Sequence, residues 1–225
     1  MIPWLQLDAA TMPGGGGELR LMQRGHEYSI MAGATELMNS RLSGSEEALA
    51  ALACARVQGR PGPQVLIGGL GMGFTLRAAL AALPADAGVT VAELVPAVVA
   101  WAKGPMAQLH GSSLNDARVV IREADVGDLI RAGTADYDAI LLDVDNGPEG
   151  LTRKANDGLY DLEGLAAARR ALRPGGVLAV WSSAPHKTYA GRLRRAGFKV
   201  EEVRVRARAG GGGARHVVWV AVRQD

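Results

Sequence analysis

From Gln64 onward, short apolar stretches alternate with alanine-rich stretches of helical length. The strand-like stretches include QVLIGG, VTVAEL, ARVVIREAD, YDAILLDVD and GGVLAVWS, and the helical ones include FTLRAALAAL, PAVVAWAKGPMAQL and LEGLAAARRAL. Short apolar strands separated by helices pair in parallel, with helices covering both faces of the sheet. The sequence therefore predicts an α/β fold with a mostly parallel sheet.

The two ends of the chain depart from this alternation. Near the C-terminus, FKVEEVRVRA and ARHVVWVAVR are joined by Gly210 to Gly213 without a helix, which predicts an antiparallel hairpin at the edge of a sheet of about seven strands. Residues 1–45 contain ELRLMQRG, HEYSIMAG and TELMNSR, separated by turn residues. We expect residues 1–45 to form a small β-meander or lid, and residues 46–225 to form the main domain, which opens with a helix capped by Ser45.

Composition excludes several classes of protein. The net charge of +2 is too small to indicate binding to nucleic acid or to an anionic membrane. One cysteine, Cys54, excludes an intramolecular disulfide framework, and the absence of clustered Cys and His predicts no metal site. With no signal peptide and no apolar run of membrane-spanning length, we expect a cytoplasmic protein.

A glycine-rich loop follows the first strand of the main domain. Ligands of parallel sheets bind beyond the carboxyl ends of the strands, and glycines let the backbone approach them closely. The spacing is Gly69-x-Gly71-x-Gly73, and Phe74 stands where a dinucleotide fingerprint would have glycine or alanine. The loop therefore favours S-adenosylmethionine over NAD.

Acidic residues follow the next two strands. Glu93 ends the second strand, 20 residues after Gly73, where a carboxylate can accept hydrogen bonds from both ribose hydroxyls. Asp125 follows the third strand, where it can bind an adenine amino group, cap the next helix, or do both. Asp128 is a nearby alternative for the adenine contact.

The fourth strand ends in Asp143-Val144-Asp145-Asn146-Gly147-Pro148. Alternation along a strand places Asp143 and Asp145 on the same face. Two close carboxylates can bind a cationic amine, and one of them can act as a base because its like-charged neighbour raises its pKa. The alternative is a solvated turn, since these residue types all favour turns.

Together these residues resemble the spermidine synthase family, the polyamine aminopropyltransferases. The similarity covers roughly residues 36–222 and is strongest from Val65 to Ser182, through VLIGGLGMGFTLRAAL, VTVAELVPAVVAWA, LLDVDNGPEG and LRPGGVLAVWS. The resemblance implies a Rossmann-like class I methyltransferase fold, S-adenosylmethionine or its decarboxylated form as donor, and often a homodimer. It places Glu93 at the ribose, Asp125 near adenine and either Asp143 or Asp145 at the catalytic position. Asn146 is a third candidate for the match to the catalytic acid, and Tyr160 matches a tyrosine downstream of that loop.

Two departures from the family pattern bear on the reaction. Gly71 stands where the family carries an aspartate that holds the amino end of the aminopropyl donor, and SEEALAALAC lacks the family's Tyr-His pair. Glu46 and Glu47 either replace that pair in binding an amine or are exposed residues of a first helical turn, the interpretation we favour. Asn146, Tyr160 and Glu46 are our substrate-binding candidates.

These departures decide our ranking of functions. We expect a transferase, and favour methyl transfer from S-adenosylmethionine to a small acceptor, such as an amine. Aminopropyl transfer from decarboxylated S-adenosylmethionine to a polyamine is the first alternative. A non-catalytic nucleotide-binding protein is the second, because fold does not imply function.

Overall fold

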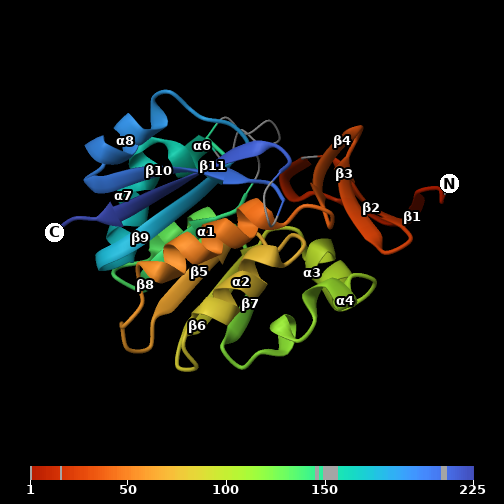
Figure 1. The fold of residues 1–225 in the computed structure, drawn as a ribbon, viewed down its shortest axis with the longest axis horizontal. Helices are drawn as coiled ribbons and strands as arrows, with labels where there is room; N and C mark the ends of the chain where they lie inside the picture. The colour runs from red at the N-terminus through yellow and green to blue at the C-terminus, as the bar shows by residue number, and fades with distance from the viewer. Residues whose placement is uncertain (1, 16, 145–146, 149–156, 209–211) are drawn as a thin grey trace.

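The computed structural model describes residues 2–15, 17–144, 147–148, 157–208 and 212–225. Within these residues the strands form a four-stranded sheet near the N-terminus and a seven-stranded sheet in the rest of the chain (Figure 1). None of the described helices is both long enough and apolar enough to span a bilayer.

The larger sheet confirms the predicted α/β class. Its strand order is β10-β11-β9-β8-β5-β6-β7, and β5 to β9 run parallel. The C-terminal hairpin inserts β11 antiparallel between β9 and β10, as the lack of an intervening helix predicts. The strands are β5 (Gln64–Gly68), β6 (Gly88–Glu93), β7 (Val119–Glu123), β8 (Tyr137–Leu142), β9 (Leu172–Ser182), β10 (Phe198–Arg206) and β11 (Arg215–Arg223).

Helices cover both faces of this sheet because its central strands are apolar on both sides. On β8, Leu141 packs with the residues of α1 and α2, whereas Ile140 packs with those of α5, α7 and α8. The α-helices are α1 (Gly44–Ala55), α2 (Phe74–Ala82), α3 (Pro96–Lys103), α4 (Ala107–His110), α5 (Val126–Ala132), α6 (Asp157–Tyr160), α7 (Leu162–Ala171) and α8 (Tyr189–Arg195). Two short 3-10 helices span Pro13–Gly15 and Ser113–Asn115.

The N-terminal sheet is an antiparallel meander of β1 (Leu5–Thr11), β2 (Glu18–Arg24), β3 (Glu27–Ala32) and β4 (Thr35–Asn39). It lies beside α3 and α4 at one end of the molecule (Figure 1). Its buried side chains, such as Leu21 and Ile30, pack with Met72 of the glycine-rich loop, with Phe74 at the start of α2 and with Trp101 of α3. The small sheet therefore covers the end of the larger sheet where ligands of α/β proteins bind.

Three local features differ from the sequence predictions. Strand β1 was not predicted, because it is an edge strand with almost no buried face and so lacks a clear apolar alternation. The single helix expected over PAVVAWAKGPMAQL is interrupted after Lys103, where Gly104-Pro105 separates α3 from α4. Ser45 is not the cap of α1; the helix begins at Gly44, and the Ser45 hydroxyl has other partners, described below.

A buried aspartate connects three strands at the end of the sheet opposite the glycine-rich loop. Asp138 on β8 is 2% exposed and forms ion pairs with Arg60 at 2.8 Å and with Arg173 at 2.7 Å. It also accepts a hydrogen bond from the backbone N–H of Gln64, the first residue of β5. One carboxylate thus joins β5, β8 and β9.

We predict that Asp138→Ala lowers the free energy of unfolding by about 2 to 3 kcal/mol, because it leaves a buried N–H and two charged partners without their acceptor. Both arginines reach solvent, which keeps the loss below that of a fully buried pair. Chemical denaturation measures this change in the free energy of unfolding. The control is Asp128→Ala, which removes an exposed Asp128–Arg131 pair and should cost less than about 0.5 kcal/mol. Equal losses in the two variants would contradict the structural role of Asp138.

Candidate active site

A cavity of about 270 Å³ lies at the carboxyl ends of β5, β6 and β8, beneath the N-terminal sheet. Four carboxylates line it, those of Glu46, Glu93, Asp125 and Asp143. Among the residues that the structure describes, no lysine or arginine lines this cavity. The remaining wall is mainly apolar, with Met12, Leu19, Leu37, Met38 and Phe74 among its side chains. A site of this composition suits a ligand with an apolar body and positively charged groups.

The glycine-rich loop forms the floor of the cavity. Gly69, Gly71 and Gly73 all line it and all have positive φ angles, of 88°, 49° and 78°. A Cβ at Gly69 would lie 2.7 Å from the carbonyl oxygen of Asp143, so a side chain at position 69 would push the loop away from β8. A Cβ at Gly71 would meet the Met38 sulfur at 3.3 Å. The glycines thus let the loop lie between β8 and the N-terminal sheet.

Glu93 holds this loop from the end of β6. Its Oε2 accepts a hydrogen bond from the Leu70 N–H and its Oε1 accepts one from the Val95 N–H, both at 2.9 Å. Burial raises the pKa of Glu93, and the backbone hydrogen bonds oppose that shift. Glu93 lines the cavity at the carboxyl end of β6, so its position is compatible with the predicted contact to two ribose hydroxyls.

Asp125 and Asp128 occupy different environments. Asp125 caps α5, with its Oδ1 accepting a hydrogen bond from the Gly127 N–H at 2.8 Å, and it lines the cavity. Asp128 does not line the cavity and instead pairs with Arg131 at the exposed surface. Of the two candidates for the adenine contact, only Asp125 is therefore placed to reach a ligand, and it combines that position with the capping role.

Asp143 lies directly after β8 and faces the cavity. Its Oδ2 accepts a hydrogen bond from the Thr75 hydroxyl of α2 at 2.6 Å, and its own N–H bonds to the Gly68 carbonyl. Burial raises the pKa of Asp143 to about 7, the neighbouring Glu46 carboxylate adds to this effect, and the Thr75 hydrogen bond opposes it. A carboxylate with a pKa near 7 is suited to accept and release protons at neutral pH.

Glu46 lies in the cavity rather than on the exposed face of α1, which corrects the interpretation we favoured from the sequence. Burial raises its pKa, while a hydrogen bond from the Ser45 hydroxyl to its Oε2, at 2.6 Å, acts in the opposite direction. The Ser45 oxygen also lies 2.9 Å from Nδ1 of His216 on β11. Ser45, Thr75 and His216 were not singled out as site residues, because contacts between distant elements leave no motif in the sequence.

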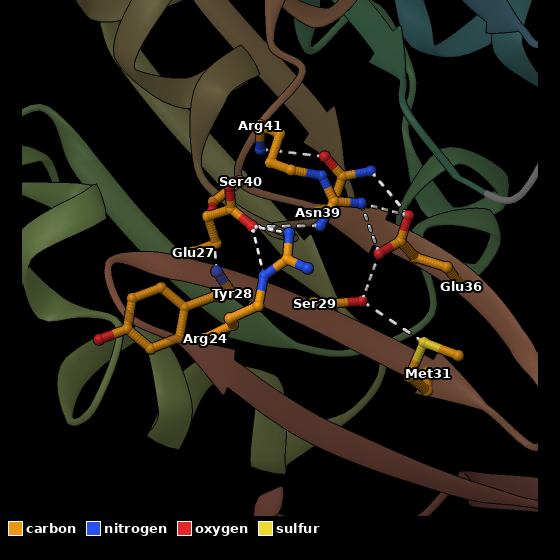
Figure 2. Close-up of polar contacts among 9 residues, drawn as sticks. All are labelled: Arg24, Glu27, Tyr28, Ser29, Met31, Glu36, Asn39, Ser40 and Arg41. Atoms are coloured by element: carbon orange, nitrogen blue, oxygen red, sulfur yellow. Dashed lines mark hydrogen bonds and ion pairs between the residues drawn. The ribbon is translucent and has the colours of Figure 1, made fainter. Parts of the chain in front are cut away.

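The end of β4 and its connection to α1 line the cavity on the side of the N-terminal sheet, through Met38, Asn39 and Leu42. Figure 2 shows the polar contacts that fix it: Arg41 donates to both Glu36 oxygens at 2.9 Å and forms an ion pair with Glu27. The Asn39 side chain donates to Glu36 and accepts from the Arg41 N–H. This network holds the connection against β3, so the roof of the cavity belongs to the N-terminal sheet.

Three predicted site residues remain to be placed. Asp145 and Asn146 fall outside the described residues. Tyr160, at the end of α6, is 1% exposed and does not line the cavity; its hydroxyl donates to the Val144 carbonyl at 3.3 Å. The structure therefore places Tyr160 beneath the segment that follows β8, where it supports Val144 rather than facing a ligand.

Comparison with known proteins places this geometry in a family. The model of the spermine/spermidine synthase domain matches residues 46–195, a span that includes Glu46, the glycine-rich loop, Glu93, Asp125 and Asp143. Polyamine aminopropyltransferase 1 of Streptomyces coelicolor is 32% identical over 153 residues, which are 64% of this chain and 28% of that protein. The chain thus spans little more than a quarter of the length of this relative.

Solved structures agree with the fold. A spermidine synthase from Thermotoga maritima superposes with a TM-score of 0.77 at 16% identity, covering 97% of this chain and 72% of that one. The 1,6-didemethyltoxoflavin-N1-methyltransferase of Burkholderia thailandensis gives a TM-score of 0.56 at 24% identity, covering 81% and 80% of the two chains. These likenesses show the class I methyltransferase fold. Because the family model covers well over half of its residues, the chain belongs to the spermine/spermidine synthase family.

Proposed function

We propose that this protein transfers an aminopropyl group from decarboxylated S-adenosylmethionine to an amine acceptor. The sequence alone led us to favour methyl transfer, but the family membership and the name of the Streptomyces relative support the aminopropyl alternative better. The observation that carries the proposal is the charge of the cavity, which has four carboxylates and, among the described residues, no lysine or arginine in its lining.

Charge complementarity separates the two donors. S-adenosylmethionine carries a carboxylate at the end of its tail, and this cavity offers that group like-charged neighbours and no described cation. Decarboxylated S-adenosylmethionine ends in an ammonium group, and both its sulfonium and that ammonium are attracted by the negative charge of the cavity. Gly71 removes the family's loop aspartate, and Met38 lies over that position, so the carboxylates for the tail come from other elements.

The nucleoside half of the donor fits the other two carboxylates. In this proposal Glu93 accepts hydrogen bonds from the ribose hydroxyls and Asp125 accepts one from the adenine amino group. The glycine-rich loop lets the backbone lie against the donor, and the N-terminal sheet excludes water from above. One solved spermidine synthase of the same fold holds the transition-state analogue AdoDATO, which supports placing a donor of this class in the corresponding cavity.

Asp143 supplies the proton acceptor. The donor, when bound, supplies an aminopropyl carbon whose bond to sulfur breaks as the bond to the acceptor nitrogen forms. Asp143 accepts the proton that this nitrogen loses, and methylthioadenosine leaves as a neutral thioether. Thr75 and Glu46 set the proton affinity of Asp143 in opposite directions. In this proposal Asp143 therefore acts on the attacking nitrogen of the acceptor, as its proton acceptor.

Calorimetric titration of the purified protein tests the donor. We expect decarboxylated S-adenosylmethionine to bind at least about tenfold more tightly than S-adenosylmethionine, with methylthioadenosine also binding, because a buried like-charge contact costs more than about 1.4 kcal/mol. Glu93→Gln should weaken all three ligands, whereas the exposed control Asp128→Asn should leave them unchanged. Tighter binding of S-adenosylmethionine would restore the methyl-transfer hypothesis, and binding of none would remove the transferase proposal.

The pH dependence of kcat/KM tests the role of Asp143. The rate should rise as the pH increases through about 7, because only the deprotonated carboxylate accepts a proton. Glu46→Gln removes a neighbouring negative charge that raises the pKa, so the rise should move to lower pH. Thr75→Val removes a hydrogen bond that lowers the pKa, so the rise should move to higher pH.

Replacing Asp143 itself measures how much this carboxylate contributes to the rate. Asp143→Asn should lower kcat by a factor of about 10² to 10⁴, the usual contribution of a general base. If the pH profiles of Glu46→Gln and Thr75→Val move in the same direction, or if neither moves, Asp143 is not the group that titrates.

A further inference from the structure

A hydrogen-bonded chain crosses from the C-terminal hairpin to the cavity. It begins at Nδ1 of His216 on β11, which lies 2.9 Å from the Ser45 hydroxyl, and it continues from that hydroxyl to Oε2 of Glu46 at 2.6 Å. Ser45 is 1% exposed, and all three residues line the cavity. These hydrogen-bonded side chains therefore lie inside the site, not on the exposed surface of α1.

The direction of these hydrogen bonds follows from their chemistry. A serine hydroxyl has one proton, and an ionised carboxylate can only accept, so Ser45 donates to Glu46 when Glu46 carries its charge. His216 must then donate its Nδ1–H to the Ser45 oxygen. This arrangement works with a neutral imidazole, and burial lowers the pKa of His216, which favours the neutral form at pH 7.

His216 is itself held in place. Its ring packs edge-on against the Trp181 indole, with ring centroids 4.9 Å apart and planes at 81°. Its backbone lies in β11, paired opposite Val205 of β10. The contact with Trp181 and the position in β11 thus fix His216, which donates the first hydrogen bond. Glu46, at the other end of the hydrogen-bonded series, lies nearest to the other carboxylates of the cavity.

Two acidic groups interact unfavourably with the Glu46 carboxylate. Glu47 in the same turn of α1 raises the pKa of Glu46, and the charge of Glu46 in turn raises the pKa of Asp143 after β8. Without a fixed partner, the Glu46 side chain would relieve this repulsion by turning away from Asp143 or by taking up a proton. The Ser45 hydrogen bond opposes both outcomes, because it favours the ionised carboxylate in one orientation.

We propose that His216 and Ser45 are positioning residues, which hold Glu46 as the anionic anchor for the ammonium group of the amine acceptor and leave Asp143 to accept the proton. The inference rests on the proposed function, since it assigns separate roles to two carboxylates of the same site. This proposal accounts for the absence of the Tyr-His pair that the family resemblance leads us to expect. Glu46 on α1 binds the ammonium group instead, and His216 on β11 holds Glu46 in position through Ser45.

The experiment is calorimetric titration of putrescine into protein saturated with methylthioadenosine, at pH 6 and pH 8. Ser45→Ala and His216→Phe should each weaken putrescine binding about tenfold, the value of one charge-assisted hydrogen bond, and should change methylthioadenosine affinity less than about twofold. The loss of putrescine affinity should be larger at pH 6, because Glu46 takes up a proton more readily once the hydrogen bonds that link His216, Ser45 and Glu46 are removed. His216→Asn, which keeps an N–H near the Nδ1 position, should restore most of the affinity.

Controls separate this inference from the proposed function and from loss of the fold. Glu47→Gln removes a charge from the same turn of α1 but leaves the hydrogen bonds among His216, Ser45 and Glu46 in place, and it should not weaken putrescine binding. Thermal unfolding verifies that each variant is folded. If the wild-type protein does not bind putrescine, the proposed function and this inference both fall. If it does, and the His216 and Ser45 variants bind putrescine normally or lose methylthioadenosine in parallel, only the positioning role is overturned.

Discussion

The hydrogen bonds of one buried carboxylate determine the shape of the cavity. Glu93 receives the N–H of Leu70 from the glycine-rich loop and the N–H of Val95 from the start of the helix after β6. Both bonds fix backbone segments that would otherwise move independently, and they set the distance between β6 and the loop. The carboxylates of Asp125 and Asp143 and the apolar wall line the same cavity around Glu93.

The position of the N-terminal sheet changes the chemistry that this frame can perform. Met38 lies against Gly71, where a larger loop residue would meet its sulfur. In the proposed function, the Glu46 carboxylate on α1 takes the place of the loop carboxylate that the family resemblance leads us to expect. Family membership and a changed residue at a family position are then compatible, because the proposal requires negative charge in the cavity and not charge at one position in the sequence.

The order of elements and the residues at strand ends could be predicted from the sequence, because both depend on local patterns. Gly69, Glu93, Asp125 and Asp143 all lie at the end of a strand or within two residues after it, and parallel pairing brings those ends together. Glu46 was misplaced because a first-turn acid has the same local pattern whether it faces solvent or a cavity. His216 and Ser45 are 171 positions apart, and no local pattern records their contact. Strand β1 was missed because almost all of its side chains are exposed, so burial imposes no clear alternation of apolar and polar residues on its sequence.

The insertion of β11 between β9 and β10 has a consequence for the order in which the protein becomes competent during synthesis. The strands whose ends position Gly69, Glu93, Asp125 and Asp143 are complete long before β11 leaves the ribosome, and among the strands that the structure describes they pair only with one another and with β9. The imidazole of His216 arrives with the last strand that the structure describes. A nascent chain can thus assemble the half of the cavity around Glu93 first, while the half around Glu46 waits for its final contact, so translation itself separates the two halves in time.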